Sequence, residues 1–182
     1  IFSHHKDVYG WNALYKNIWV GHDQEVFQPY WLDPKKLKDF DWTQSKYFVT
    51  SISCPFILIK GFTIPRYKEF IKHAKKYATV KVVVIGRDRN ILKHQQLRVR
   101  KGKYTTPTFL QHMKALDEPV FVSQELFFLY GTDYLKSLSK QLDFPISTGT
   151  YIKNLSKHEA NKKYIKKAER GKFDKYQFKI NY

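Results

Sequence analysis

An apolar run rich in β-branched residues occupies positions 80–86 of the chain. A run of this kind is typical of a strand that is buried on both faces, as the strands of parallel sheets are. The run stops at Gly86, and the charged residues Arg87 and Asp88 follow at once. Because the ligands of open α/β sheets bind outside the carboxyl ends of the strands, this pattern makes Arg87 and Asp88 candidates for a functional site.

Similar patterns predict elements on both sides of this strand. Apolar runs predict strands at 47–52, 56–60 and 119–123, an irregular edge strand around Pro29, and the end of a short strand at 1–3. Apolar residues at helical spacing predict helices near 11–20, 64–77, 90–100, 107–116 and 132–143, and Asp33-Pro34 opens a further short basic helix. The strand–helix–strand order of 56–86 predicts a right-handed βαβ unit. We therefore expect a three-layer α/β fold around a mainly parallel sheet.

The chain is long enough for one domain, and its composition changes only near the end. Residues 151–182 hold ten Lys and Arg against three Asp and Glu, with a thin apolar stripe. No linker of low complexity separates the two parts. We expect an α/β domain over residues 1–150 and a basic helix and tail, 151–182, packed on it.

The net charge points to an anionic partner. The sequence has 33 Lys and Arg against 16 Asp and Glu, a formal charge of +17, which favours a polyanion, with nucleic acid first and phosphate-bearing small ligands second. A solvated basic surface without a specific partner is the alternative. The single Cys54 excludes an internal disulfide. We expect a cytoplasmic location, because no signal peptide is visible and no apolar run is long enough to span a membrane.

The first loop has the layout of a phosphate site. Lys6 and Gly10 lie between the end of the first predicted strand and a helix that begins near Trp11 and Asn12. Backbone N–H groups at such a helix start can hold an anion. A plain strand-to-helix turn is the alternative, since the loop has one glycine and matches no Walker pattern. His4-His5 suggests a metal site, but no third ligand has a recognisable spacing.

Four stretches follow one another in an informative order: a strand end with Lys6 and Gly10, then 57–65, then 82–90 followed by Gln95, then 120–126 followed by a helix that ends at 144–146. This order resembles the sulfotransferase superfamily, P-loop-like α/β enzymes that use the sulfate donor PAPS. The resemblance covers most of the chain.

The resemblance implies a donor, PAPS or a related 3′-phosphonucleotide, and the residues that hold it. Lys6, Gly10, Trp11 and Asn12 stand where the family has its loop for the 5′-phosphosulfate, although the Pro and the Gly-Thr pair of that loop are missing here. Arg87, with Gln95 eight residues later, matches the Arg and Ser that hold the 3′-phosphate. The chain also departs from the family pattern, because Phe62 stands where the family has its catalytic His and Gln95 replaces the Ser.

Sulfuryl or phosphoryl transfer needs cations around the moving group and a base for the acceptor oxygen. Lys6, Lys60 and Arg87 fall at predicted strand ends, and we expect them to meet in one pocket. Because Phe62 cannot take a proton, the substitute bases by position are His4, His5 and Asp88, and each is also interpretable as an ordinary loop residue.

Two functional hypotheses follow. The first is a sulfotransferase-like transferase that moves a sulfuryl or phosphoryl group from a phosphonucleotide donor, with a nucleic acid or a nucleotide as one candidate acceptor. The second is a non-catalytic nucleic-acid-binding protein on a degenerate transferase fold, favoured by the charge and by aromatic residues available for stacking on bases. A structural subunit of a larger assembly is a third interpretation.

Overall fold

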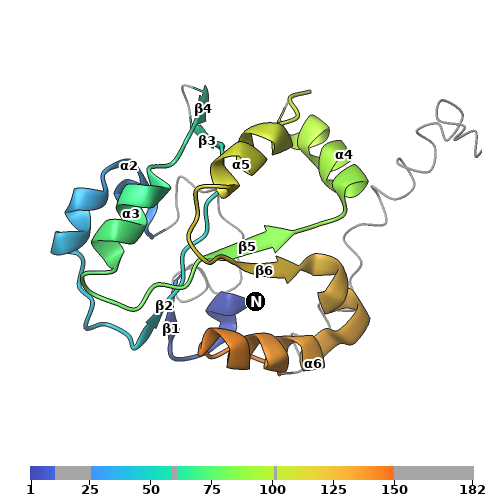
Figure 1. Cartoon of the computed structure of the whole chain (residues 1–182). Helices are drawn as coiled ribbons and strands as arrows, with labels where there is room; N and C mark the ends of the chain where they lie inside the picture. The colour runs from blue at the N-terminus through green and yellow to red at the C-terminus, as the bar shows by residue number, and fades with distance from the viewer. Residues whose placement is uncertain (11–25, 59–60, 101, 150–182) are drawn as a thin grey trace, which may run out of the picture.

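A computed structural model describes residues 1–10, 26–58, 61–100 and 102–149. The predicted helix near 11–20, the candidates Trp11, Asn12 and Lys60, and the predicted basic helix and tail at 151–182 lie outside the described residues. In chain order the elements are η1 (Phe2–His4), β1 (Val8–Tyr9), α2 (Gln28–Leu32), η3 (Pro34–Asp39), β2 (Tyr47–Phe48), β3 (Phe56–Leu58), β4 (Gly61–Thr63), α3 (Tyr67–Ala74), β5 (Val83–Gly86), α4 (Arg89–Val99), α5 (Thr106–Met113), β6 (Val120–Ser123) and α6 (Gln124–Leu142), where η marks a 3-10 helix (Figure 1).

The strands of the described residues form three separate pairs. β1 pairs with β2 and β5 pairs with β6, both in parallel, whereas β3 pairs antiparallel with β4. The strand predicted at 56–60 therefore belongs to a hairpin and not to a parallel sheet. β4 begins at Gly61, whose φ of 119° suits glycine best. A single central sheet in a three-layer α/β fold stays a prediction.

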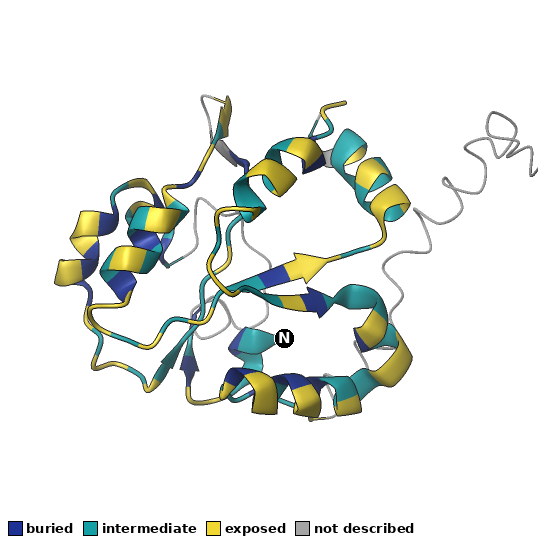
Figure 2. Ribbon diagram, in the orientation of Figure 1, coloured by how far each residue is buried: buried dark blue, intermediate teal, exposed yellow. Residues whose placement is uncertain are grey.

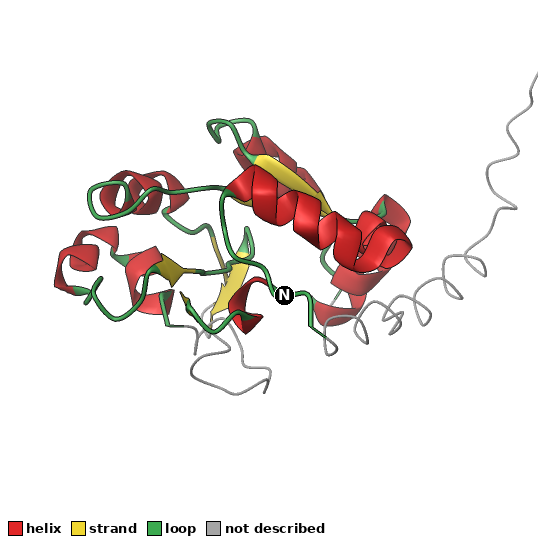
Figure 3. Ribbon diagram, turned by 90° about the horizontal axis from the view of Figure 1, so that it is seen from below, coloured by secondary structure: helices red, strands yellow, loops and turns green. Residues whose placement is uncertain are grey.

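The first apolar core lies between the β5–β6 pair and α6. Buried side chains at helical spacing on α6 form a cluster with the strand residue Val122: Phe127, Leu135, Leu138 and Leu142, joined by Ile146 beyond the helix. Ile1 and Phe2 pack against the same cluster, so η1 lies beside it. Figures 1 and 3 both show α6 lying across one side of the strand pair. This core fixes the edge at which β5 and β6 end.

α6 consists of two helical segments. Gly131 has a φ of 54° and a ψ of −125°, which interrupts the helix, and Asp143 ends it in the left-handed region with a φ of 49°. The helix predicted at 132–143 corresponds to the second segment. The first segment, which begins at Gln124 directly after β6, was not predicted, because the few residues before Gly131 hold too little helical periodicity.

The second core is aromatic and lies around α2, η3 and α3. Trp31 stacks on Phe70 with ring centroids 3.8 Å apart, and Phe27 packs on Phe40 at 4.7 Å. The indole of Trp31 donates a hydrogen bond to Thr50 Oγ1 at 3.0 Å, which satisfies its polar atom. The cluster is completed by the buried residues Leu37 and Ala74. It holds the elements on the left of Figure 1 together.

The strand at β5 is less buried than the apolar run predicts. Val84 and Val122 are buried, but Ile85 is 62% exposed and Phe121 is 70% exposed. Figure 2 shows both buried and exposed colours along the two strands of this pair. In a parallel pair the two residues in register project from the same face, and Val84 is in register with Phe121 and Ile85 with Val122. Each face of the pair is therefore only partly covered, and the prediction of burial on both faces was wrong. An apolar sequence favours the burial of a strand, but the elements packed against the strand determine how much of its surface is buried.

The helices expected at 64–77, 90–100 and 107–116 are confirmed as α3, α4 and α5, and the short basic helix after Asp33 is η3. Two interpretations were wrong. The edge strand around Pro29 is α2, in which proline occupies the first turn, where its missing N–H costs no hydrogen bond. The strand end at 1–3 is η1. Across the described ranges, every helix falls short of the length and apolarity that crossing a membrane demands.

Candidate anion-binding site

The carboxyl ends of β5 and β6 bring two loops to one edge. Gly86 is in register with Ser123, so Arg87 and Gln124 leave the pair side by side. Each strand leads directly into a helix, β5 into α4 and β6 into α6. Helix N-termini carry partial positive charge, and at this edge the side chains of Asp88 and Ser123 cap the two helix starts. Sequence analysis predicts this edge from the end of the apolar run.

Arg87 and Gln95 lie in contact at this edge. Arg87 follows β5, and its guanidinium Nη1 donates a hydrogen bond to Gln95 Oε1 on the second turn of α4. Both side chains are half-buried. When Oε1 of Gln95 accepts from Arg87, the amide NH2 is the part of Gln95 that can donate to an anion. The structure therefore brings together the two residues that the sequence resemblance predicts to hold a 3′-phosphate.

Asp88 has a structural task at the same edge. Its Oδ1 accepts hydrogen bonds from the N–H groups of Asn90 at 2.9 Å and Ile91 at 3.0 Å, which makes Asp88 the N-cap of α4. A carboxylate at a helix N-terminus is stabilised by these bonds and by the helix dipole. These contacts alone account for an acidic residue at this position. A catalytic role for Asp88 stays a prediction.

A second carboxylate ties the two loops together. Glu125 Oε1 accepts from the backbone N–H of Asp88 at 2.9 Å, and its Oε2 accepts from Ser123 Oγ at 3.1 Å. Ser123 caps α6 by accepting from the N–H of Leu126, and its own N–H donates to the hydroxyl of Tyr134 at 3.0 Å. Ser123, Glu125 and Tyr134 were not predicted as parts of the site. To predict them, one would need the register between β5 and β6, two strands that are far apart in sequence.

We expect Asp88→Ala to lower the free energy of unfolding by about 1 kcal/mol, because the cap of α4 is lost. Asp88→Asn keeps an oxygen that can accept the same hydrogen bonds, so its free energy of unfolding should lie within a few tenths of a kcal/mol of the native value. Urea unfolding monitored by circular dichroism measures both variants. Equal losses in the two variants would show that the charge matters and the cap geometry does not.

His4, His5 and Lys6 lie around η1 and the turn that follows it. The backbone N–H of Asp7 donates to His5 Nδ1 at 3.3 Å, and Lys6 is exposed. Burial lowers the pKa of His4, which favours the neutral imidazole that a general base requires. The strand that follows this turn, β1, pairs with β2, and in the described residues β5 has β6 as its strand partner. We had expected Lys6 and Arg87 to follow neighbouring strands, and in the described residues they do not.

Gly10 is accounted for by packing. A Cβ atom at this position would lie 2.6 Å from Val49 Cγ1 and 2.7 Å from the carbonyl oxygen of Val49. The Val49 N–H donates to the carbonyl oxygen of Tyr9 at 2.9 Å, which holds the two segments at this spacing. The close approach requires glycine here whether or not a phosphate binds nearby.

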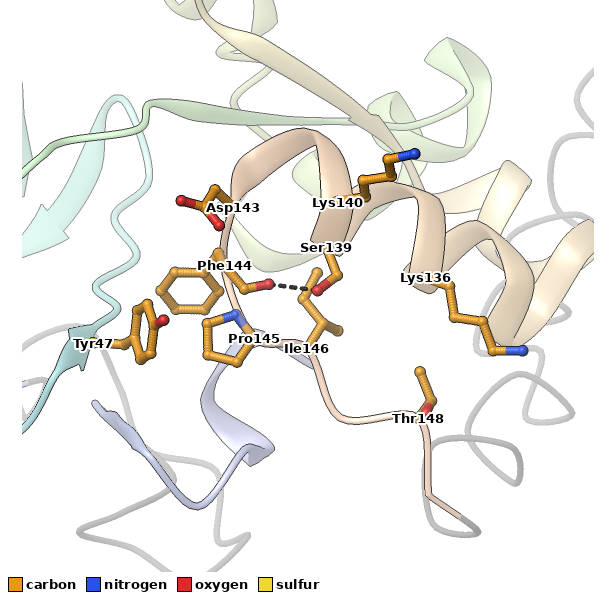
Figure 4. Close-up of a pocket in the computed structure, with 9 residues that line it drawn as sticks. All are labelled: Tyr47, Lys136, Ser139, Lys140, Asp143, Phe144, Pro145, Ile146 and Thr148. Carbon is orange, nitrogen blue, oxygen red and sulfur yellow. Dashed lines mark hydrogen bonds between the residues drawn. The ribbon is translucent and has the colours of Figure 1, made fainter.

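Neither of two cavities in the described part of the chain is lined by Lys6 or Arg87. The larger, of about 510 Å³, opens at the C-terminal end of α6, with walls that include Tyr47, Lys136 and Lys140 (Figure 4). Lysines near a helix C-terminus compensate the partial negative charge there. The smaller, of about 280 Å³, lies beside Tyr67 and His112. A pocket shared by Lys6, Lys60 and Arg87 stays a prediction.

Phe62, at the position of the family's catalytic His, lies on β4 of the hairpin. Its ring is 37% exposed, and the guanidinium carbon of Arg100 lies 5.7 Å from the ring centroid. Cations close to an aromatic ring interact with its negative face. Phe62 therefore belongs to a basic and aromatic surface, described below, and offers no acid–base chemistry.

Among the described residues no group of three or more His, Cys, Asp or Glu side chains has the arrangement of a metal site. The strongest candidate for chemistry in this part of the chain is thus the Arg87–Gln95 pair, framed by the two capped helix starts. No protein-family model, no curated protein and no solved structure matches this chain.

Proposed function

We propose that this chain is a sulfotransferase-like transferase that binds a 3′-phosphonucleotide donor, PAPS or a relative, at the carboxyl ends of β5 and β6. The observation that carries the proposal is the contact between Arg87 and Gln95 at this edge. The family resemblance assigns these two positions to the donor's 3′-phosphate. A cytoplasmic location is part of the proposal, because Cys54 is the single cysteine and no disulfide can form within the chain.

The chemistry of the edge supports phosphate binding. The Arg guanidinium presents two parallel N–H donors to a phosphate, and its charge does not titrate. The contact with Gln95 holds the guanidinium in place before the ligand arrives, which lowers the entropy lost on binding. Asp88 already caps α4, so the proposal assigns the anion to the side chains of Arg87 and Gln95 and not to the helix start itself.

The transfer step would break the bond between sulfur and the bridging oxygen of the donor and form one between sulfur and an acceptor oxygen. The leaving oxygen departs with the nucleotide phosphate, and the acceptor proton goes to a base. His4 is the base that the proposal favours, because its lowered pKa keeps the imidazole neutral and because η1 packs on the same apolar cluster as Val122 of β6.

The proposal is tested by titrating the full chain with adenosine 3′,5′-bisphosphate in a calorimeter. We expect the native chain to bind, and Arg87→Ala to lose roughly tenfold or more in affinity, since charge-assisted hydrogen bonds contribute about 1.5–3 kcal/mol. The melting temperature of Arg87→Ala should remain close to that of the native chain. Arg98→Ala is the matched control, because Arg98 is an exposed arginine on the same helix.

Two results would contradict the proposal. If the native chain does not bind at millimolar ligand, the donor assignment is wrong. If Arg87→Ala and Arg98→Ala bind alike, the nucleotide is held elsewhere and the β5–β6 edge is not its site.

A further inference from the structure

One face of α4 carries a stripe of long polar side chains. Arg89, Lys93, Gln96 and Arg100 are spaced by four, three and four residues, which places them in one row along the helix. Gln95, the partner of Arg87, lies about a third of a turn away around the helix axis. The stripe is therefore a different face from the one that meets the proposed donor site.

The segment that follows α4 is fastened to this stripe. Gly102, with a φ of 83°, reverses the chain, and its N–H donates to the carbonyl oxygen of Leu97 at 2.8 Å. Gln96 Oε1 then accepts from the N–H groups of Thr105 at 2.9 Å and Thr106 at 3.2 Å. These bonds hold residues 102–106 beside the helix, so Lys103 and Tyr104 have fixed backbone positions.

Arg100 connects the stripe to the β3–β4 hairpin. Its Nη1 donates to Thr105 Oγ1 at 2.7 Å and to the carbonyl oxygen of Pro55 at 3.0 Å. Its guanidinium carbon lies 5.7 Å from the centroid of the Phe62 ring, and Lys103 Nζ lies 5.0 Å from the same centroid. Phe62 is 37% exposed. An accessible aromatic ring thus has two cations close to it.

Tyr104 is a second aromatic ring in a cationic setting. Burial alone would raise the pKa of Tyr104, but the hydrogen bonds from Arg89 and Thr106 and the charges of Arg89 and Lys93 outweigh it and lower the pKa. Arg89 therefore acts on the phenol through a hydrogen bond and through its charge, and Lys93 acts through its charge. Together, Arg89, Lys93, Arg100, Lys103, Phe62 and Tyr104 form what we call the α4 basic face.

Within the described ranges, no acidic side chain forms an ion pair with the cations of this face. Residues 89–116 contain seven Lys and Arg and no Asp or Glu. In the described part of the chain the ion pairs that involve Lys or Arg are Arg66–Glu69 and Lys136–Asp133, and neither involves Arg89, Lys93, Arg100 or Lys103. Gathered like charges repel, and an anionic occupant removes that cost.

We propose that the α4 basic face binds single-stranded nucleic acid, with the cations on the phosphates and with Phe62 and Tyr104 against the bases. Sequence-tolerant sites for single strands combine a cationic track with aromatic rings on which bases stack, and this face has both. A duplex keeps its bases stacked on one another and leaves the rings without a partner. A sulfated polysaccharide or an acidic protein satisfies the cations but supplies no bases to the two rings.

The experiment measures the fluorescence anisotropy of a labelled 20-nucleotide oligo(dT) bound to the full chain, at several salt concentrations. We expect binding that weakens steeply with salt. The double variant Lys93→Ala, Lys103→Ala should lose at least tenfold in affinity, and its plot of log K against log salt should flatten by about one to two units, since each phosphate contact on a single strand contributes about 0.7. Phe62→Ala should lose about tenfold with an unchanged slope, because stacking is not ionic.

The matched control is the double variant Lys35→Ala, Lys36→Ala. Both lysines are exposed on η3, and their removal changes the net charge by the same two units. We expect this control to lose less than threefold in affinity. Circular dichroism and melting temperature establish that each variant is folded, and Phe62→Leu replaces Phe62→Ala if the latter is not.

Three outcomes would overturn the proposal. Equal losses in the two lysine pairs would show a response to net charge alone. An unchanged affinity in the Phe62 variant, with heparin or duplex DNA displacing the oligonucleotide at equal concentration, would assign the face to another polyanion. Loss of oligonucleotide binding in Arg87→Ala as large as in Lys93→Ala, Lys103→Ala would place the strand on the donor site.

Discussion

Phe27→Ala should lower the free energy of unfolding by about 3–5 kcal/mol, the range for removing a large aromatic side chain from a packed core. Phe27 is 2% exposed and lies at the centre of the aromatic core. Its ring packs against four other rings, with centroid distances of 4.7 Å to Phe40, 6.0 Å to Tyr30, 6.3 Å to Phe70 and 6.4 Å to Trp42. Alanine leaves a cavity that these rigid rings cannot close.

Urea unfolding followed by tryptophan fluorescence measures this loss as a lower midpoint at an unchanged slope. Because a domain has only about 5–15 kcal/mol of stability, Phe27→Leu is the companion variant, with a smaller expected loss. The control is Phe121→Ala, since Phe121 is 70% exposed and its removal should change stability by less than about 0.5 kcal/mol. Similar midpoints for Phe27→Ala and Phe121→Ala would mean that the aromatic core contributes little.

The aromatic core shows which parts of the fold a local pattern can predict. α3 was predicted because its apolar residues recur at helical spacing over several turns. In the structure, Phe70 and Ala74 are the buried residues of this helix. α2 was missed, because five residues hold too little periodicity and Pro29 was interpreted as an edge-strand signal. The role of proline at a helix start and at a sheet edge is the same, an absent N–H, so sequence alone did not separate the two.

The candidate site divides in a similar way. Arg87 was found from the end of the apolar run and Gln95 from the family resemblance, and the structure places the two in contact. The bond between the Asp88 N–H and Glu125 joins residues 37 positions apart. Such contacts depend on strand register, which no local pattern specifies. We expected Lys6 beside Arg87 because a strand end was predicted at 1–3, whereas these residues belong to η1 and the strand after Lys6 pairs with β2.

Gly10→Ala is the second variant with a large expected effect, a loss of roughly 2–3 kcal/mol of stability from overpacking. The new Cβ would lie 2.7 Å from the Val49 carbonyl oxygen, a backbone atom that cannot rotate away. Either β1 or β2 must shift, and the hydrogen bond from the Val49 N–H to Tyr9 weakens with it. The midpoint of urea unfolding measures the effect. Gly86→Ala is the control, because its Cβ would lie 3.7 Å from the nearest atom, the Val122 carbonyl oxygen, which is an ordinary contact.

The same variant separates the two explanations for a glycine in the first loop. If Gly10 serves packing, Gly10→Ala loses stability, and the fraction that remains folded binds adenosine 3′,5′-bisphosphate with the native affinity. If Gly10 lets the backbone approach a phosphate, the affinity falls while the unfolding midpoint stays near that of Gly86→Ala. Shortening Val49 to alanine removes the contact with Cγ1 but leaves the one with the carbonyl oxygen. The double variant Gly10→Ala, Val49→Ala should therefore recover only part of the stability, and full recovery would place the conflict in the Val49 side chain alone.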